Sequence, residues 1–495
     1  MQKPEDNRSL KHKTVTGITW NLTGNLADRG ITWLVNIILC RLILPAEFGI
    51  LGVIAIFMAI AFSMIDSGFN SALLRKNDCT EKDYNTVFYI NLGVSIFFYL
   101  LFFSTAPLMA NFFNEPRLVD IVRVNSFVLI LHALSMIQNV LLTKMFNFKY
   151  QAFVNITAAV VSGIVAIVLA FKGWGVWSIV IKNIVSLSVI FTLLWTKQIW
   201  RPSPVFSKES FKNLFGFGSR ILISGLLNTI CRNIYYPVIG KIFSKETLGF
   251  YTRAQSFSEY FSFTFSANIQ RVSYPALSSI QNDDERLKTV YRSLIKVTML
   301  ITCTMTFGLA AISGPMVEAL IGGIWIPCVT YIQLMCFSAI FYPLFMINTN
   351  MFNVKGRSDL SLKLEIIKQA LSLPMIAVAI IWGVEALLIA GIVVAILSYL
   401  MYSYYSSGII SYSMSEQLKD IAPQFLFAGV MAFAMWTLTF FSLSAWVMLT
   451  VQIAAGATMF FIYHEYRKPE EYTELKELAI TNIKKLLNKK RSTKI

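Results

Sequence analysis

Long apolar segments follow one another along almost the whole chain, from about residue 15 to residue 463, with short turns between them. A helix that crosses a bilayer needs roughly 20 mostly apolar residues. The pattern predicts an all-α integral membrane protein with about fourteen spans. The predicted spans are 15–40, 48–70, 86–112, 118–143, 151–171, 174–196, 213–238, 248–270, 291–320, 326–352, 361–382, 385–407, 421–441 and 444–464.

Composition agrees with this interpretation. Of 495 residues, 56% are hydrophobic and 14% charged, and the mean hydropathy is +0.60, which is typical of integral membrane proteins. The formal net charge of +16 would suit a nucleic-acid partner if the cations formed one patch. They follow the predicted topology instead: with the N-terminus inside, about 31 Lys and Arg residues are cytoplasmic and 8 are outside. We expect both termini in the cytoplasm and no nucleic-acid partner.

A weak internal repeat divides the predicted spans. LPAEFGILG at residues 44–52 opens the second span, and FSKETLGFYTRAQ at residues 243–255 opens the eighth. Two six-helix bundles related in this way would place a substrate site between them, near the middle of the membrane. The predicted domains are two six-helix bundles, an additional helix pair and a basic amphipathic tail on the inner leaflet or in solvent, at residues 1–200, 201–410, 411–464 and 465–495.

Polar side chains form stripes on three predicted spans, at about 100° per residue. Hydrogen bonding between helices is the favoured interpretation of the Ser, Thr and Asn positions. The stripe of the first span is Asn21, Asn25, Asp28, Arg29, Thr32 and Asn36; that of the seventh is Arg220, Ser224, Asn228, Arg232 and Tyr235; that of the eighth is Gln255, Glu259, Ser262, Ser266 and Gln270.

Several cations lie deep within the predicted spans, where a charge is costly. The planar fork of arginine suits phosphate oxygens, so these cations indicate an anionic substrate. The candidate substrate-binding residues are Arg29, Arg232, Arg220 and Lys182. A fixed carboxylate partner is the alternative for Arg29. For Lys182, an ammonium that reaches the headgroups is the favoured interpretation, and lining an outward-facing cavity is the other.

Two acidic residues, Asp28 and Glu259, are the candidates for binding a coupling Na⁺ or H⁺, unless they serve as fixed counter-ions to arginines. His132 is interpreted as a packing histidine rather than a proton relay. Glu365 and Lys368, three residues apart, predict a local ion pair.

Several functional classes lack their signatures. The chain has no Walker motif, Gly-rich phosphate loop or nucleophile elbow, so ATP-driven transport is not expected, and an ion or substrate gradient must supply the drive. It has no C-x-x-C, and its six cysteines lie almost entirely in apolar segments, so we expect no disulfide framework, metal site or cofactor.

Several motifs resemble those of a known family. CRLILPAEFGILGVIAI, then MIDSGFNSALLRKND, then NTVFYINLG are similar to the polysaccharide flippases of the multidrug/oligosaccharidyl-lipid/polysaccharide exporter superfamily, and most like its Wzx-type O-antigen and exopolysaccharide exporters. In the second half, GFYTRAQ and RVSYPALSSIQ are similar to the corresponding stretches. The resemblance covers spans one to twelve.

This resemblance implies a V-shaped pair of bundles in the bacterial inner membrane that flips an undecaprenyl-pyrophosphate-linked oligosaccharide to the outer leaflet. Expected partners are that lipid, the membrane, and the polymerase and glycosyltransferases of the same polysaccharide. Related lipid II flippases place first-helix arginines in a central cavity beside an acidic residue. Asp28 and Arg29 occupy a comparable place, in the order Asp-Arg. The added helix pair is similar to that of fourteen-helix members.

Two rival functions are weaker. A multidrug or cation antiporter on the same scaffold would favour acidic rather than basic residues deep in the cavity. A membrane glycosyltransferase or polymerase would need acidic catalytic residues in a sizeable outer loop, and the predicted outer turns are short. We therefore expect a transporter and not an enzyme.

Overall fold

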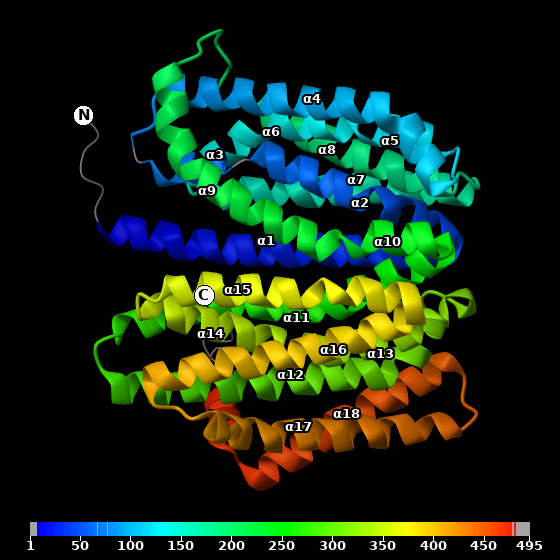
Figure 1. Ribbon diagram of the computed structural model, residues 1–495, viewed down its shortest axis with the longest axis vertical. Helices are drawn as coiled ribbons and strands as arrows, with labels where there is room; N and C mark the ends of the chain where they lie inside the picture. The colour runs from blue at the N-terminus through cyan, green and yellow to red at the C-terminus, as the bar shows by residue number, and fades with distance from the viewer. Residues whose placement is uncertain (1–6, 67, 77, 198, 478–479, 482–495) are drawn as a thin grey trace, which may run out of the picture. The chain divides into compact units, whose positions relative to one another are not determined.

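The regular structure of the described chain is entirely helical. A computed structural model describes residues 7–66, 68–76, 78–197, 199–477 and 480–481 (Figure 1). The chain forms two compact units, residues 1–249 and 250–495. In each of them the helices run roughly parallel to one another. The predicted all-α class is confirmed.

The first unit contains ten helices and the start of an eleventh, within the described residues. They are α1 (Asn7–Leu42), α2 (Pro45–Asp66), α3 (Phe69–Arg75), α4 (Glu81–Phe113), α5 (Leu118–Asn125), α6 (Phe127–Lys144), α7 (Phe148–Phe171), α8 (Val176–Thr196), α9 (Lys208–Asn233), α10 (Tyr235–Ile242) and the first turn of α11 (Lys245–Ser279).

The second unit contains the rest of α11 and the helices that follow it. They are α12 (Asp284–Leu320), the 3-10 turn η1 (Gly323–Trp325), α13 (Cys328–Ala339), α14 (Tyr342–Val354), α15 (Ser358–Ser372), α16 (Pro374–Ile410), α17 (Met414–Thr437), the 3-10 turn η2 (Leu438–Phe440) and α18 (Ala445–Arg467).

Ten helical segments of the described chain are long and apolar enough to cross a membrane. One of them, Ser358–Ile410, has 53 residues. At about 1.5 Å per residue it would extend about 80 Å as one helix, far beyond the ~30 Å hydrocarbon core. Gly383 interrupts it with a non-helical φ of 92° and ψ of 179°, between the predicted spans 361–382 and 385–407.

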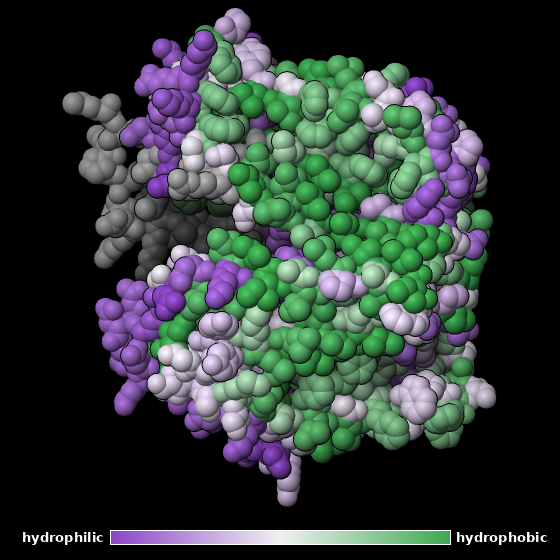
Figure 2. Space-filling model, in the orientation of Figure 1, coloured by the Kyte–Doolittle hydropathy of each residue, from purple (hydrophilic) through white to green (hydrophobic). Residues whose placement is uncertain are grey.

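The surface has the polarity expected of a protein in lipid. On the face that Figure 2 shows, hydrophobic residues cover the sides of the helices of each unit, and hydrophilic residues gather near the helix ends. On α17, for example, Val430 is 62% exposed and Phe433 64% exposed. Large exposed apolar side chains in continuous helices fit a hydrocarbon solvent better than water.

Several polar side chains that are buried between helices form hydrogen bonds with neighbouring helices. Tyr291 Oη of α12 donates to Asn348 Oδ1 of α14 at 2.8 Å. Ser403 Oγ of α16 donates to Gln417 Oε1 of α17 at 2.8 Å. These bonds stabilise helix packing where no water is available to replace them. The predicted pair is also confirmed, because Lys368 Nζ lies 2.7 Å from Glu365 Oε2.

The added helix pair packs against α12. The guanidinium of Arg292 binds both carboxylate oxygens of Asp420 on α17, at 2.5 and 2.7 Å. Residues 470–477 form a further short helix, in which Glu471 accepts a hydrogen bond of 3.3 Å from Gln424 of α17. The start of the tail therefore packs on the second unit, while residues 482–495 lie outside the described residues.

The first compact unit extends further along the chain than the first predicted bundle. Helices α9 and α10 pack against α2 and α4, and α9 also packs against α3, so this unit ends at Gly249. The predicted boundaries at residues 200, 410 and 464 stay predictions.

The two repeated motifs meet at their helix starts. A Cβ on Gly49 of α2 would lie 1.8 Å from the carbonyl oxygen of Lys245, and a Cβ on Gly249 of α11 would lie 2.0 Å from that of Pro45. Each helix start therefore touches the backbone of the other through a glycine. Only a residue without a side chain permits this distance. Both contacts lie within the first unit.

A buried carboxylate holds the same region together. Glu115, in the loop between α4 and α5, is 6% exposed. It accepts a hydrogen bond from Arg117 Nε at 2.8 Å and one from Lys245 Nζ. These hydrogen bonds, that of Arg117 first, lower the pKa of Glu115 to about 2, although its burial acts in the opposite direction. The ion cluster ties the start of α11 to the end of α4.

Gly49→Ala and Gly249→Ala would each force a methyl group against a helix backbone. We expect each substitution to lower the free energy of unfolding by about 1–3 kcal/mol, seen as a lower Tm of the purified protein in detergent. Gly93→Ala on α4 is the matched control, because nothing lies within 4 Å of its Cβ position. Equal Tm values for all three variants would contradict the close crossing.

The lowered pKa of Glu115 predicts a pH-dependent contribution to stability. Its folded pKa of about 2 lies below the ordinary value of 4.5, so its stabilising effect is complete above pH ~4.5 and is lost as the pH falls towards ~2. Wild type should have a higher Tm than Glu115→Gln at pH 7, and the difference should shrink between pH 5 and pH 3. A difference that stays constant over that range would show that the charge of Glu115 contributes nothing.

Candidate functional site

Small residues determine how α1 lies in the first unit. A Cβ on Gly24 would be 2.4 Å from Cβ of Ala152 on α7, and a Cβ on Gly163 of α7 would be 2.5 Å from Cγ2 of Val35. These close contacts bring α1 against α7 along one face. Most of the polar stripe of α1 is rotated away from that face, and Asp28, four residues after Gly24, lies at its edge.

The stripe of α1 lies at the edge of this packing. Asn25 and Arg29 are exposed, while Asp28, Thr32 and Asn36 are half-buried. Thirteen residues separate Arg29 from Leu42, the last residue of α1, which is about 20 Å along the helix axis. The side chain of Asn21 lies outside the described residues. The guanidinium of Arg29 therefore belongs to the middle of a long helix and not to its end.

Helix α8 adds a second cation to this stripe. Lys182 Nζ donates to Asn36 Oδ1 of α1 at 3.2 Å, so its side chain is directed towards α1. Asp28 lies within electrostatic range of both Arg29 and Lys182. The structure thus brings three of the predicted site residues together with Asn36. We call Asp28, Arg29, Asn36 and Lys182 the α1–α8 cluster.

The stripe of α9 is less completely described. Ser224, Asn228 and Arg232 are exposed, and Tyr235, which begins α10, is half-buried. The side chain of Arg220 lies outside the described residues. Arg232 belongs to the same compact unit as the α1–α8 cluster. Its role in binding substrate stays a prediction.

On α11 the described part of the stripe is a hydrogen-bonded pair. Gln255 Nε2 donates to Glu259 Oε1 at 2.7 Å, and Glu259 is half-buried. The side chains of Ser262, Ser266 and Gln270 lie outside the described residues. Glu259 belongs to the second compact unit, and its role in ion coupling stays a prediction.

Asp66 is a charged residue that our sequence reasoning did not select. It ends α2 and lies 3.3 Å from Nε2 of His132 on α6. The segment MIDSGF could have pointed to Asp66, because an acidic residue and a glycine end a long apolar run there. Periodicity alone did not show that this carboxylate meets a histidine 66 positions further along the chain.

The α1–α8 cluster has the chemistry of an anion site. Two cations and one carboxylate leave a positive net charge, and an exposed guanidinium can bind phosphate oxygens through two parallel hydrogen bonds. Within the described part of the chain, no three His, Cys, Asp or Glu side chains are grouped so that they could hold a metal ion.

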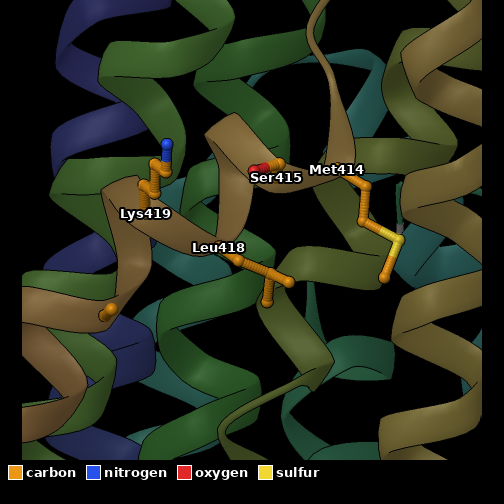
Figure 3. Close-up of a pocket in the computed structure, with 5 residues that line it drawn as sticks. Met414, Ser415, Leu418 and Lys419 are labelled. Atoms are coloured by element: carbon orange, nitrogen blue, oxygen red, sulfur yellow. The ribbon is translucent and has the colours of Figure 1, made fainter.

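A shallow hollow beside the start of α17 differs from this cluster. It is lined by Met414, Ser415, Leu418, Lys419 and Ala422 (Figure 3). Met414 and Leu418 make it largely apolar, and the Lys419 side chain extends in a different direction from that of Leu418. It lacks the combination of two cations and a carboxylate that marks the α1–α8 cluster.

Comparison with known proteins agrees with these features. A family model described as polysaccharide biosynthesis protein matches residues 38–330. The chain is similar to the teichuronic acid biosynthesis protein TuaB of Bacillus subtilis, with 23% identity over 83% of this chain and 87% of that protein. It is also similar to the lipopolysaccharide biosynthesis protein WzxC of Escherichia coli, with 24% identity over 75% of this chain and 76% of that protein.

The fold is that of a solved flippase. The lipid II flippase MurJ, in an inward closed conformation, matches with a TM-score of 0.74 and 16% sequence identity, over 90% of this chain and 99% of that chain. At this identity the match establishes the fold and not the substrate. The chain thus has the helical fold of this solved membrane protein, with ten described segments long and apolar enough to cross a membrane.

Water should reach the stripes of α1 and α9 if they line a substrate path. We expect Arg29→Cys and Arg232→Cys, in a background without the six native cysteines, to react with a charged, water-soluble methanethiosulfonate. Thiols in hydrocarbon stay protonated and unreactive. Ile164→Cys on α7, where the native side chain is 59% exposed, is the lipid-facing control. Labelling at 164 but not at 29 would contradict an aqueous surface around Arg29.

Proposed function

Because the chain belongs to the family of polysaccharide biosynthesis proteins, we propose that it is a flippase for a lipid-linked oligosaccharide. The substrate is an undecaprenyl-pyrophosphate-linked repeat unit, moved from the cytoplasmic to the outer leaflet for synthesis of a cell-surface polysaccharide. The single observation that carries this proposal is the α1–α8 cluster, in which Arg29 and Lys182 lie within electrostatic range of the one carboxylate of Asp28.

The main energetic barrier to flipping is moving the polar headgroup of the lipid across the hydrocarbon core. A pyrophosphate with attached sugars would lose its water in hydrocarbon, at a cost of several kcal/mol for each unpaired polar group. Fixed cations and amide donors inside a bundle replace those lost hydrogen bonds, while the polyprenyl chain stays in lipid. The exposed Arg29 side chain and the neighbouring Lys182 are suited to this task. Arg232 on α9 is proposed to add to the cationic lining, and the role of Arg220 stays a prediction.

The proposed topology follows from the helices. The ten apolar segments include one that is broken at Gly383, and α1, α9 with α10, and α11 have the length of spans although their stripes make them more polar. Counting Ser358–Ile410 as two spans gives fourteen. The distribution of Lys and Arg supports cytoplasmic termini in the bacterial inner membrane.

Transport is proposed to proceed by alternating access. The two six-helix bundles rock about the membrane midplane, with an ion gradient or the substrate gradient as the drive. Asp28 and Glu259 are the proposed ion-coupling residues. Binding must stay moderate, because a substrate held too tightly in the occluded state would not be released.

A multidrug or cation antiporter is the alternative on this scaffold. Its substrate would be positively charged and would be repelled by a cluster in which the cations outnumber the carboxylate. The relatives and the matching solved structure are described as biosynthesis or transport proteins, which supports a transporter over a membrane glycosyltransferase.

Arg29→Ala should abolish surface display of the glycan, with normal abundance of the protein in the membrane, and lipid-linked oligosaccharide should accumulate in the cell. Arg29→Lys should restore activity only in part, because an ammonium lacks the bidentate fork. Mass spectrometry measures how much lipid-linked oligosaccharide accumulates in each variant and identifies its repeat unit.

Arg123→Ala is the matched control, because Arg123 of α5 donates to the carbonyl oxygen of Phe103, at 3.3 Å, instead of joining a polar stripe. It should display glycan at the wild-type level. Normal display in Arg29→Ala would remove Arg29 from the mechanism, and full rescue by Arg29→Lys would reduce its role to simple charge attraction.

A further inference from the structure

The apolar segment that contains α2 and α3 is interrupted between these two helices. Helix α2 ends at Asp66 and α3 begins at Phe69, although Pro45–Arg75 as a whole is long and apolar enough to span a membrane. Gly68 has a φ of 68°, a left-handed conformation that glycine adopts without steric cost. Interrupted spans in transporters leave helix ends at membrane depth, where they bind ions.

Asp66 stands at this break and meets a histidine from the neighbouring helix. Asp66 Oδ1 lies 3.3 Å from His132 Nε2, and the two side chains are 54% and 29% exposed. Phe62, one turn earlier on α2, packs edge-on against the imidazole, with ring centroids 5.0 Å apart. The spacing of four residues places Phe62 and Asp66 on one face of α2. That face holds the imidazole ring beside the carboxylate.

Several helices that pack against α2 and α6 carry charged residues. Helix α2 packs against α4, α6, α8, α9 and α10. The charged residues of α9 and α10 are Lys208, Glu209, Lys212, Arg232 and Lys241, with Arg220, whose side chain lies outside the described residues. Helix α6 packs against α2, α3, α4, α5, α7 and α8. Among the described residues, Asp66 is the charged group in contact with His132. The other charged residues of these helices are Glu47 on α2, Arg75 on α3, Glu81, Lys82 and Asp83 in the first turn of α4, Asp120 and Arg123 on α5, Lys144 on α6 itself, Lys149 on α7 and Lys182 on α8.

The break also touches α9 directly. A Cβ on Gly68 would lie 2.2 Å from the carbonyl oxygen of Gly218, so the backbones of the two segments are in contact. Phe69 packs against Phe211 and Phe215 of α9, with centroid distances of 6.0 and 6.2 Å. Residues 68 and 69 are therefore in direct contact with α9, the helix that carries Arg220 and Arg232.

We propose that His132 and Asp66 form a proton-binding site that couples a proton gradient to the position of α9. In the unprotonated state the pair carries the negative charge of Asp66, at the C-terminal end of a helix where the helix dipole disfavours an anion. One bound proton makes an imidazolium–carboxylate pair without net charge, which is easier to enclose at low dielectric. Proton binding thus favours burial of the pair against α9, and proton release favours its exposure to water.

This site deepens the proposed flippase function, because it names the coupling ion, and it rests on that function for its role in transport. It is distinct from Asp28 and Glu259, to which coupling was assigned from the sequence. A first test can be made without any substrate. Ser224→Cys on α9, in a cysteine-free background, accepts a pH-insensitive fluorophore whose emission reports its surroundings.

We expect the emission of this label to change between pH 8 and pH 5 in the parent protein in nanodiscs. The change should disappear in Asp66→Asn and in His132→Gln, which keep a polar side chain but cannot complete the pair. His464→Gln is the matched control, because His464 is a buried histidine that binds Gln424 on α17, in the second unit. It should keep the change, and Asp66→Glu should restore it at least in part.

The second test measures transport. Proteoliposomes receive undecaprenyl-pyrophosphate-linked oligosaccharide extracted from the producing cells, and an imposed proton gradient should accelerate its translocation. Asp66→Asn and His132→Gln should reduce this acceleration about tenfold, as expected for a coupling free energy of ordinary size. His464→Gln should stay within about twofold of the parent protein.

The outcomes separate the two proposals. If the label on α9 responds to pH through Asp66 but no glycan is moved, the flippase assignment fails and the proton site stands. If glycan is moved at the same rate with and without the proton gradient, or if Asp66→Asn keeps the pH response, the proton site is overturned and the flippase assignment stands.

Discussion

A polar group inside hydrocarbon must find its partner within the protein, and this constraint shapes the whole molecule. It explains why the described regular structure is helical, because a helix satisfies its own backbone. It also explains why Tyr291 meets Asn348 and why Arg292 binds Asp420 through two hydrogen bonds. Charged residues that serve no packing purpose would be costly at such depth. For this reason the charges of the α1–α8 cluster are the basis of the proposed substrate site.

Close contacts at glycines between helices determine where the polar side chains of α1 lie. Gly24 and Gly163 let α1 and α7 approach until the stripe of α1 lies beside α8, where Lys182 reaches Asn36. Gly49 and Gly249 perform a similar task for the two repeated motifs, whose helix starts touch reciprocally. In lipid, where water does not drive helices together, close van der Waals contact between small residues supplies much of the association energy.

The first unit combines two kinds of charged site with different chemistry. The α1–α8 cluster has excess positive charge and suits a phosphate-bearing headgroup, while the His132–Asp66 pair changes its net charge by binding one proton. Helix α9 is related to both, because it carries predicted substrate-binding arginines and touches the α2–α3 break at Gly218. In the proposed mechanism, a proton and a lipid pyrophosphate act on one helix without sharing a binding group.

The sequence alone determined the all-α class, the positions of the most apolar spans, the break near residue 383 and the pairing of Glu365 with Lys368. These features depend on segment length or on residues within one helical turn. The tertiary structure decided that Lys182 meets Asn36, 146 positions away, that Asp66 meets His132, and that α9 and α10 complete the first unit. Such contacts depend on the rotation, tilt and neighbours of each helix, and hydrophobic periodicity in a span that is apolar on nearly every side does not specify them.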